Sequence, residues 1–233
     1  MEDWHNVDFV KSWDESASRG NPSRENQLSL LITLLSERCQ SGDTILDLGI
    51  GSAQVEERLF LKRADVNIVG IDHSSAMLEI ARERLRKTTL RNTQCVLYHH
   101  ELADIDTLRF SHNAFSHVIA VQTLHHLEPE TQKQIYGRVF DLVKNNGLFL
   151  LMDRVNIDGP KLNSVYAATW NWLENQSAIK SGWSGQYFLE RLASQHDYPL
   201  SVETTVSWLE EAGFQAACLD LTLNRALYVG IKG

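Results

Sequence analysis

The sequence predicts an α/β fold built on a Rossmann-like, mostly parallel, seven-stranded sheet with helices on both faces. Two observations carry this prediction. Five short apolar runs alternate with amphipathic segments from Thr44 onward, and two further apolar runs near the C-terminus are separated by only a few residues. The alternation is typical of parallel strands joined by helical crossovers. The short separation leaves room only for an antiparallel hairpin.

The first five strands are expected in the runs TILDLG, VNIVGID, QCVLYH, FSHVIAV and GLFLLMD. Helices are expected between them at residues 54–62, 74–87 and 129–145. In the second helix, Met77, Ile80, Ala81 and Leu85 recur at helical spacing, so that one apolar face can cover the sheet. Ser74 is placed to cap the first turn of that helix. A further amphipathic helix, SRENQLSLLITLLSERC, leads into the first strand.

The chain is expected to form a single domain over residues 1–233. Residues 1–42 are interpreted as a helical lead-in and lid, in which Trp4 and Trp13 either close a pocket or belong to a disordered end of the chain. Residues 157–198 are aromatic-rich and lack strand alternation, which predicts a small helical insert over the active site after the fifth strand. The run SVETTVSWLEEAGF then predicts a helix that ends at Gly213, followed by the hairpin strands QAACLDL and RALYVGI.

Composition excludes several classes of function. The formal net charge is −8, so the totals give no sign of the basic surface that a nucleic-acid binder needs. The three cysteines form no CxxC pair, and no run reaches the roughly 18 apolar residues of a membrane span. We therefore expect a cytoplasmic protein, monomeric or homodimeric, that binds a small-molecule substrate rather than a nucleic acid or a membrane.

The segment TILDLGIGSAQVEERL, residues 44–59, predicts a nucleotide-binding turn. Gly49 and Gly51 follow a strand and precede a helix, an arrangement that lets a ligand approach main-chain N–H groups at the carboxyl edge of a sheet. Asp72 ends the next strand, where a carboxylate can accept hydrogen bonds from both hydroxyls of a ribose. Together these features predict an adenosine-containing ligand that lies across the two strand ends.

Two residues indicate which adenosine ligand is bound. Gln54 stands where the dinucleotide fingerprint has its last glycine, and Asp47 would repel a pyrophosphate but attract a cationic ligand. This favours S-adenosylmethionine over a nicotinamide cofactor. Three alternatives stay open. The first is an NAD-dependent oxidoreductase on the same core, the second is a non-catalytic module that binds S-adenosylmethionine for a partner protein, and the third is transfer to tRNA or protein.

The segment DLGIGSA resembles the first motif of the class I S-adenosylmethionine-dependent methyltransferases. The resemblance to that family covers roughly residues 27–153 and the hairpin near the C-terminus. Ala53 departs from the third glycine, and Glu101 with Leu102 stands where the family has Asp and a small residue that meets the adenine. The resemblance implies a methyltransferase that converts S-adenosylmethionine to S-adenosylhomocysteine. The cofactor-binding residues it indicates are Asp47, Gly49, Gly51, Asp72, His73, Glu101, Leu102 and Val121.

The acceptor side is less well specified, because methyl transfer from a sulfonium is an in-line displacement with a neutral leaving group. Alignment in a desolvated pocket is the main requirement, and a base is needed only if the acceptor must lose a proton. The candidates at or beyond the carboxyl ends of the last parallel strands are His126, Asp153, Arg154, Tyr166, Trp170 and Tyr187. Arg154 could hold an anionic acceptor, and the aromatic residues could either line the pocket or form the core of the insert. No metal site is expected.

Overall fold

The computed structural model describes residues 4, 6–16, 24–88, 94–157, 159–177, 180–194 and 196–233. Parts of the predicted lead-in and of the predicted insert therefore lie outside the described residues. Seven strands form one sheet in the order β3-β2-β1-β4-β5-β7-β6. Their bounds are β1 (Thr44–Leu48), β2 (Asn67–Asp72), β3 (Cys95–His99), β4 (His117–Val121), β5 (Leu148–Arg154), β6 (Gln215–Thr222) and β7 (Arg225–Ile231).

The pairing of the strands confirms the predicted fold class. The pairs β1–β2, β2–β3, β1–β4 and β4–β5 are parallel. Strand β7 pairs antiparallel with both β5 and β6, which places the last strand of the chain between two earlier ones. In this register Arg154 lies directly opposite Arg225.

The helices agree with the predicted segments to within a few residues, and α1 lies in the predicted helical lead-in, for which no bounds of a separate helix were given. They are α1 (Val7–Ser16), α2 (Arg24–Arg38), α3 (Gln54–Phe60), α4 (Ser75–Thr88), α5 (Pro129–Leu142), α6 (Asn163–Gln176), α7 (Gly185–Ala193) and α8 (Val202–Glu211). Short 3-10 helices are η1 (Leu102–Leu108), η2 (Leu124–His126) and η3 (Pro160–Leu162). Helix α1 lies in the lead-in segment, and the predicted insert contains α6 and α7.

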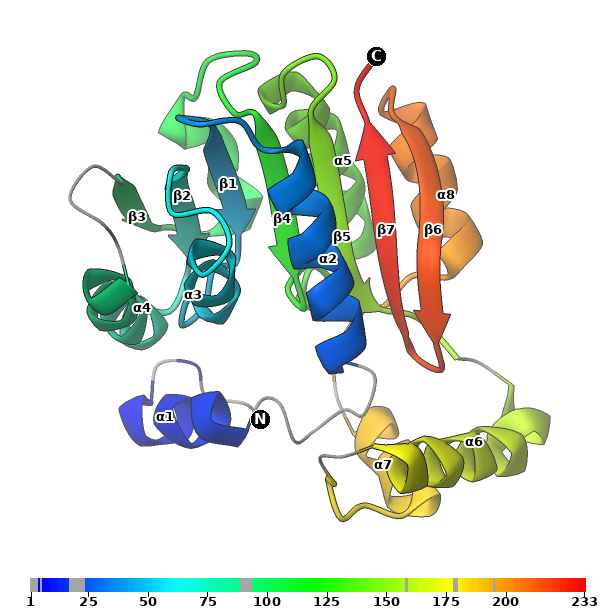
Figure 1. The fold of residues 1–233 in the computed structure, drawn as a ribbon. Helices are drawn as coiled ribbons and strands as arrows, with labels where there is room; N and C mark the ends of the chain where they lie inside the picture. The colour runs from blue at the N-terminus through cyan, green and yellow to red at the C-terminus, as the bar shows by residue number, and fades with distance from the viewer. Residues whose placement is uncertain are drawn as a thin grey trace.

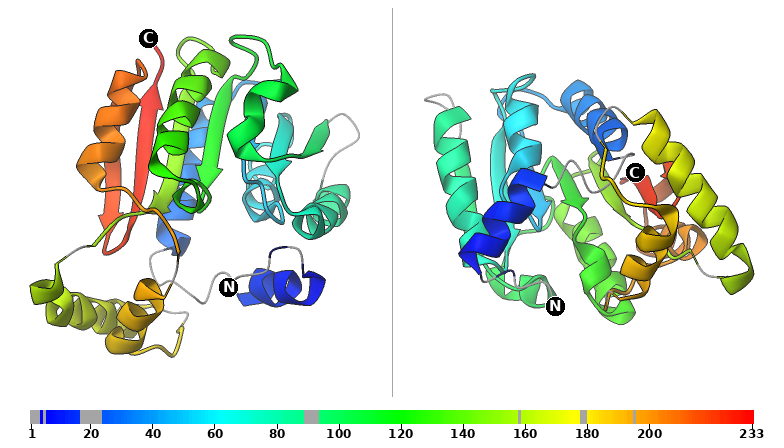
Figure 2. Two further views of the ribbon diagram at one scale, coloured as in Figure 1. Left: turned by 180° about the vertical axis from the view of Figure 1, so that it is seen from behind. Right: turned by 90° about the horizontal axis from the view of Figure 1, so that it is seen from below.

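Two apolar layers cover the sheet. Helices α2, α3 and α4 pack on one face, with Leu31 and Leu59 in the centre of that layer. Helices α5 and α8 pack on the other face, with Tyr136 and Leu209. Figure 1 shows that the parallel strands all point toward the edge where α1, α6 and α7 lie, and Figure 2 shows the same helices from below. This carboxyl edge is where a ligand of such a sheet is bound.

Among the described residues, no helix combines the length and the apolar character that crossing a membrane requires.

Candidate active site

A cavity of about 260 Å³ lies at the carboxyl ends of β1, β2 and β4. Most of the residues that the sequence predicted for cofactor binding line it: Gly49, Gly51, Asp72, His73, Glu101, Leu102 and Val121. The other lining residues are Trp4, Trp13, Ser74, Met77, Gln122, Thr123, His126 and Leu127. The cavity thus combines the two predicted strand ends with the N-terminal segment and with the loop after β4.

The glycine turn after β1 leaves space for a ligand at one position and is tightly packed at the other. Gly49 has φ +78°, and a Cβ there would lie 2.2 Å from Oγ1 of Thr123. Gly51 has φ +54°, and the nearest atom to a Cβ there would be the Gly49 carbonyl oxygen at 4.0 Å. Gly49 is therefore required by the fold itself, whereas the space above Gly51 is open to a ligand.

Asp72 joins the glycine turn to the start of α4. One carboxylate oxygen accepts a hydrogen bond from the Gly51 N–H and the other from the Ser74 N–H, both at 2.8 Å. The residue is 7% exposed, and burial raises the pKa of its carboxyl above the usual range. Ser74 in turn caps α4, because its Oγ accepts from the Met77 N–H at 3.1 Å. Each carboxylate oxygen keeps a second lone pair for a ribose hydroxyl.

Asp47 differs from its predicted place, because it lies beneath the glycine turn and does not line the cavity. It is 1% exposed, and its Oδ1 has no hydrogen-bond partner among the described residues. Glu56 of α3 is equally buried next to it, and burial raises the pKa of both carboxyls. Sequence analysis did not single out Glu56. The sequence does contain a pattern that could have identified it. Glu56 precedes Leu59 by three residues and Phe60 by four, which places it on the buried face of α3.

On the acceptor side, His126 is the predicted residue that reaches the cavity. Its Nδ1 lies 2.9 Å from Oδ1 of Asp197, and the other oxygen of Asp197 accepts a hydrogen bond from the Arg154 guanidinium. A carboxylate at Nδ1 fixes the tautomer with the proton on that nitrogen, so that Nε2 is the basic atom of the ring. Asp197 lies just before α8 and was not predicted as a functional residue.

Asp153 supports the neighbouring histidine and does not line the cavity. Its carboxylate accepts hydrogen bonds from the His125 ring at Nδ1 and from the backbone N–H groups of His125 and Arg154. Burial lowers the pKa of His125 to about 4. The pair therefore holds η2, and with it His126, at the end of β5.

The three aromatic candidates of the insert lie away from the cavity. Trp170 is 1% exposed and stacks on Phe188 at 4.0 Å between ring centroids, so it forms the core of the α6–α7 pair. Tyr187 is 44% exposed and contacts Trp183 edge to face. Tyr166 does not line the cavity either. Trp170 therefore belongs to the core of a small cap, which is one of the two roles considered for these aromatic residues. None of the three residues lines the cavity.

The N-terminal segment supplies the aromatic wall of the cavity instead. Trp4 and Trp13 line it and contact each other edge to face with ring centroids 5.3 Å apart. Asp14 anchors this segment to the core, since its carboxylate forms an ion pair with Arg84 at 2.7 Å and accepts a hydrogen bond from Gln54 Nε2 at 2.6 Å. The predicted lid is thus held by charged contacts to α4 and to the start of α3.

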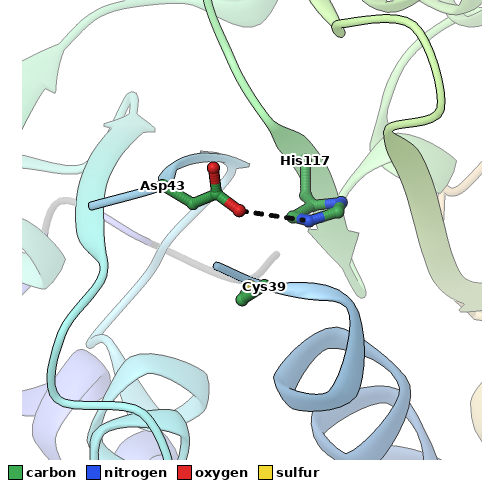
Figure 3. A group of neighbouring side chains, drawn as sticks. All are labelled: Cys39, Asp43 and His117. Carbon is green, nitrogen blue, oxygen red and sulfur yellow. Dashed lines mark ion pairs between the residues drawn. The ribbon is translucent and has the colours of Figure 1, made fainter. Parts of the chain in front are cut away.

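A group of potential metal ligands at the opposite edge of the sheet is structural. Figure 3 shows the carboxylate of Asp43 facing His117, with Cys39 at the end of α2 nearby. The Leu148 N–H donates to Nδ1 of His117 at 3.1 Å, so the ring proton sits on Nε2, which faces Asp43 at 3.8 Å. Asp43 also accepts from Ser116 Oγ and from the Gln40 N–H. A metal at Nε2 would have to reverse this tautomer against the Leu148 N–H.

Comparisons with known proteins agree with this geometry. Residues 45–147 match a family model described as a methyltransferase domain. A relative from Nautilia profundicola, named carboxy-S-adenosyl-L-methionine synthase, is 22% identical over 87% of this chain and 82% of its own length.

Two solved structures share the fold. The S-adenosylmethionine-dependent methyltransferase SibL superposes with a TM-score of 0.60 at 19% identity over 90% of this chain and 55% of its own. A Haemonchus contortus phosphoethanolamine N-methyltransferase 2, solved with S-adenosyl-L-methionine, gives a TM-score of 0.66 at 13% identity over 97% of this chain and 57% of its own. The chain therefore spans a little over half the length of these two proteins.

The matched domain contains the glycine turn and Asp72, the carboxylate that ends β2. The strand order of the sheet and the names of the relatives are consistent with a methyltransferase domain. The protein is an enzyme that uses S-adenosylmethionine, and the NAD-dependent alternative is not supported. Residues 45–147 match a methyltransferase domain, and the chain is similar in sequence and fold to S-adenosylmethionine-dependent enzymes of this kind.

Proposed function

We propose that this enzyme transfers the methyl group of S-adenosylmethionine to a small-molecule acceptor by in-line displacement. The observation that carries the proposal is the wall of the cavity. Trp4 and Trp13 stand on one side of it and His126 on another, which suits an acceptor small enough to be enclosed. An enclosed site also excludes water and fixes the alignment of the reacting atoms, which are the main requirements of this displacement.

We assign cofactor roles to the residues around the glycine turn. Asp72 would accept the ribose hydroxyls, Leu102 and Met77 would contact the adenine, and the methionine portion would lie over Gly51. Asp47 would act indirectly, as a buried negative group beneath the turn. His73, Glu101 and Val121 would complete the contacts with the nucleoside.

His126 is the proposed general base for an acceptor that must lose a proton. Its Nδ1 is held by Asp197, which leaves Nε2 to accept a proton from a hydroxyl, an amine or an acidic carbon. Arg154 fixes Asp197 in place, and Asp153 fixes the loop that carries His126.

The decisive experiment is incubation of the enzyme with methyl-labelled S-adenosylmethionine and a fractionated metabolite extract. We expect label in a product of low molecular mass and release of S-adenosylhomocysteine. Label confined to protein or RNA fractions would contradict the small-molecule assignment. Binding of the cofactor without transfer to any fraction would favour the non-catalytic module.

The relative from Nautilia profundicola supports a second candidate, in which a carboxyl group from a donor in the extract replaces a hydrogen of S-adenosylmethionine and that hydrogen leaves as a proton. Mass spectrometry of the cofactor pool in the same incubation separates the two activities. Methyl transfer yields S-adenosylhomocysteine, whereas this alternative yields a heavier, carboxylated S-adenosylmethionine.

The Asp72→Asn variant tests the cofactor half by calorimetry. Because an amide cannot accept as strongly from both ribose hydroxyls, affinity for S-adenosylhomocysteine should fall about tenfold or more. The matched control is Asp65→Asn, which changes an exposed carboxylate in the loop before β2 and should leave the affinity unchanged.

A further inference from the structure

Arg225, the first residue of β7, carries a guanidinium that no carboxylate of the described chain neutralises. Its Nε and Nη1 are buried and have no hydrogen-bond partner. Burial, followed by the charges of Arg154 and Arg24, lowers the pKa of Arg225 to about 9. The residue as a whole is partly exposed, and the charge of Asp153 acts on it. The two buried nitrogens nevertheless cost free energy while they lack an acceptor, and a ligand that accepts from them would relieve this cost.

Two further arginines converge on the same place. Arg154 lies opposite Arg225 in the β5–β7 register, so their side chains leave the same face of the sheet. Arg24, 6% exposed at the start of α2, donates from Nη2 to Gln54 Oε1, while its Nη1 has no hydrogen-bond partner. Figure 1 shows the start of α2, the end of β5 and the start of β7 at one edge of the sheet, above α6 and α7.

The nearby carboxylates already accept hydrogen bonds from other groups. Asp153 accepts from His125 and from two backbone N–H groups, and Asp197 is shared by His126 and Arg154. Glu25 lies 3.7 Å from Arg24 Nη1, but both of its oxygens accept from Arg58, at 2.7 and 3.1 Å. Asp220 accepts from Gln27, which also donates to the Arg225 carbonyl oxygen. None of the three arginines lines the cavity itself, and within the described residues Arg225 forms no ion pair.

The arginines are connected to the cavity on both sides. Arg154 is bonded to Asp197, which holds the cavity residue His126. Arg24 is bonded to Gln54, which follows the glycine turn and also contacts Asp14 beside the cavity residue Trp13. We propose that Arg24, Arg154 and Arg225 bind the anionic group, a carboxylate or a phosphate, of the methyl acceptor. This inference rests on the proposed function, because it names the acceptor class for the same site.

The same arginines argue against a cation at this edge. His125, His126 and Asp197 place potential metal ligands within 4.8 Å of one another. The Arg154 guanidinium occupies one oxygen of that aspartate, and a divalent ion there would also face the charge of Arg225. A ligand with negative charge relieves this repulsion, whereas a metal ion would add to it.

The first test measures anion binding directly. Enzyme saturated with S-adenosylhomocysteine is titrated with succinate, with acetate and with inorganic phosphate at constant ionic strength, and thermal stabilisation and heat of binding are recorded. We expect at least one of these anions to bind, and the choice between carboxylate and phosphate shows which headgroup fits. Absence of binding by all three would overturn the proposal.

The Arg225→Met variant distinguishes loss of anion binding from misfolding, because the melting temperature and the anion affinity should change in opposite directions. Removing a buried, unpaired charge should raise the melting temperature of the free enzyme, by about 2 °C or more, while anion affinity falls about tenfold or more. Affinity for S-adenosylhomocysteine should stay unchanged. The control Arg82→Gln removes an exposed guanidinium of α4 and should change neither quantity. Unchanged anion affinity in Arg225→Met would refute the assignment.

The second test uses the labelled-cofactor assay on an extract separated by anion exchange. The acceptor should be retained by the resin, and Arg225→Lys should retain more activity than Arg225→Met. Methylation confined to the unretained, neutral or cationic fraction would contradict an anionic acceptor while leaving the methyltransferase assignment intact. If no fraction accepts label, the proposed function fails, and the titration of anions still decides whether the arginines form a site.

Discussion

At the scale of single residues, the buried pair Asp47 and Glu56 makes stability depend on pH in an unusual direction. Burial raises the pKa of both carboxyls above their values in the unfolded chain, which lie near 4. Their contribution to stability is therefore complete below about pH 4 and is lost as the pH rises through the folded-state values. A carboxyl that is paired with an arginine has a lowered pKa, so its contribution to stability is lost as the pH falls.

The Glu56→Gln variant should be more stable than the parent enzyme at pH 8, by roughly 1–2 kcal/mol, because an amide needs no proton to be buried and can donate to Asp47. The gain should shrink toward pH 4. Chemical unfolding at several pH values measures it. Glu57→Gln changes a partly exposed residue of the same helix that forms a surface ion pair with Arg84, so it should lower stability by less than about 1 kcal/mol. A gain equal to that of Glu56→Gln would contradict the explanation.

A second residue-scale prediction concerns His126. Its replacement by Gln should lower kcat about 100-fold or more for an acceptor that must lose a proton, and leave affinity for S-adenosylhomocysteine within a few-fold. Stopped assays with labelled cofactor measure kcat of the parent and of the variant. A variant with full kcat would exclude the proposed base.

At the scale of elements, the α6–α7 pair depends on one close approach. Gly185 begins α7, and a Cβ there would lie 2.0 Å from the Ala167 carbonyl oxygen of α6. Glycine is thus required at that position for packing and not for an unusual φ angle. The Trp170 ring stacked on Phe188 adds the apolar core that joins the two helices.

The Gly185→Ala variant should destabilise the insert by about 1–3 kcal/mol and make it more sensitive to limited proteolysis, because backbone must move to admit the methyl group. Gly137→Ala is the matched control. A Cβ at Gly137 meets nothing within 4 Å on α5, so this change should be neutral or add about 0.5–1 kcal/mol of stability. Equal effects in the two variants would rule out the packing explanation.

The elements could largely be predicted from sequence, but two groups of contacts could not. Apolar periodicity fixed the strands and the helices of the core because burial on one face imposes a regular spacing. Helical structure was expected in residues 1–42, but the bounds of α1 were not predicted, since Trp4, Trp13 and Met77 pack across distant segments and give no local pattern. Asp197 and Arg225 meet the end of β5 only through the tertiary fold, and neither belongs to a motif.

At the scale of the whole molecule, the N-terminal segment and the core form the cavity together. Burial alone would raise the pKa of Asp14, but its contacts with Arg84, Ser52 and Gln54 lower it overall. The stability that this carboxylate provides is therefore present above about pH 4 and is lost as the pH falls through its lowered folded-state pKa. Acid should therefore weaken the attachment of the N-terminal segment to α4, because protonated Asp14 no longer pairs with Arg84.

The Asp14→Asn variant should weaken S-adenosylhomocysteine binding about fivefold or more at pH 7, because the lid loses its charged anchor. Calorimetry measures the affinity, and the fluorescence of Trp4 and Trp13 reports the docking of the segment. Glu15→Gln changes the exposed neighbouring residue and should bind as the parent does. A normal affinity in Asp14→Asn would mean that the segment docks without this anchor.

The position of β7 between β5 and β6 has a consequence for synthesis on the ribosome. The nucleotide-binding strands and β6 are all made before β7, so until residues 225–231 emerge, β5 has an unpaired edge and β6 has no neighbour in the sheet. Unpaired edges of apolar strands associate readily with other chains. A nascent or prematurely terminated chain therefore risks aggregation until its last strand closes the sheet.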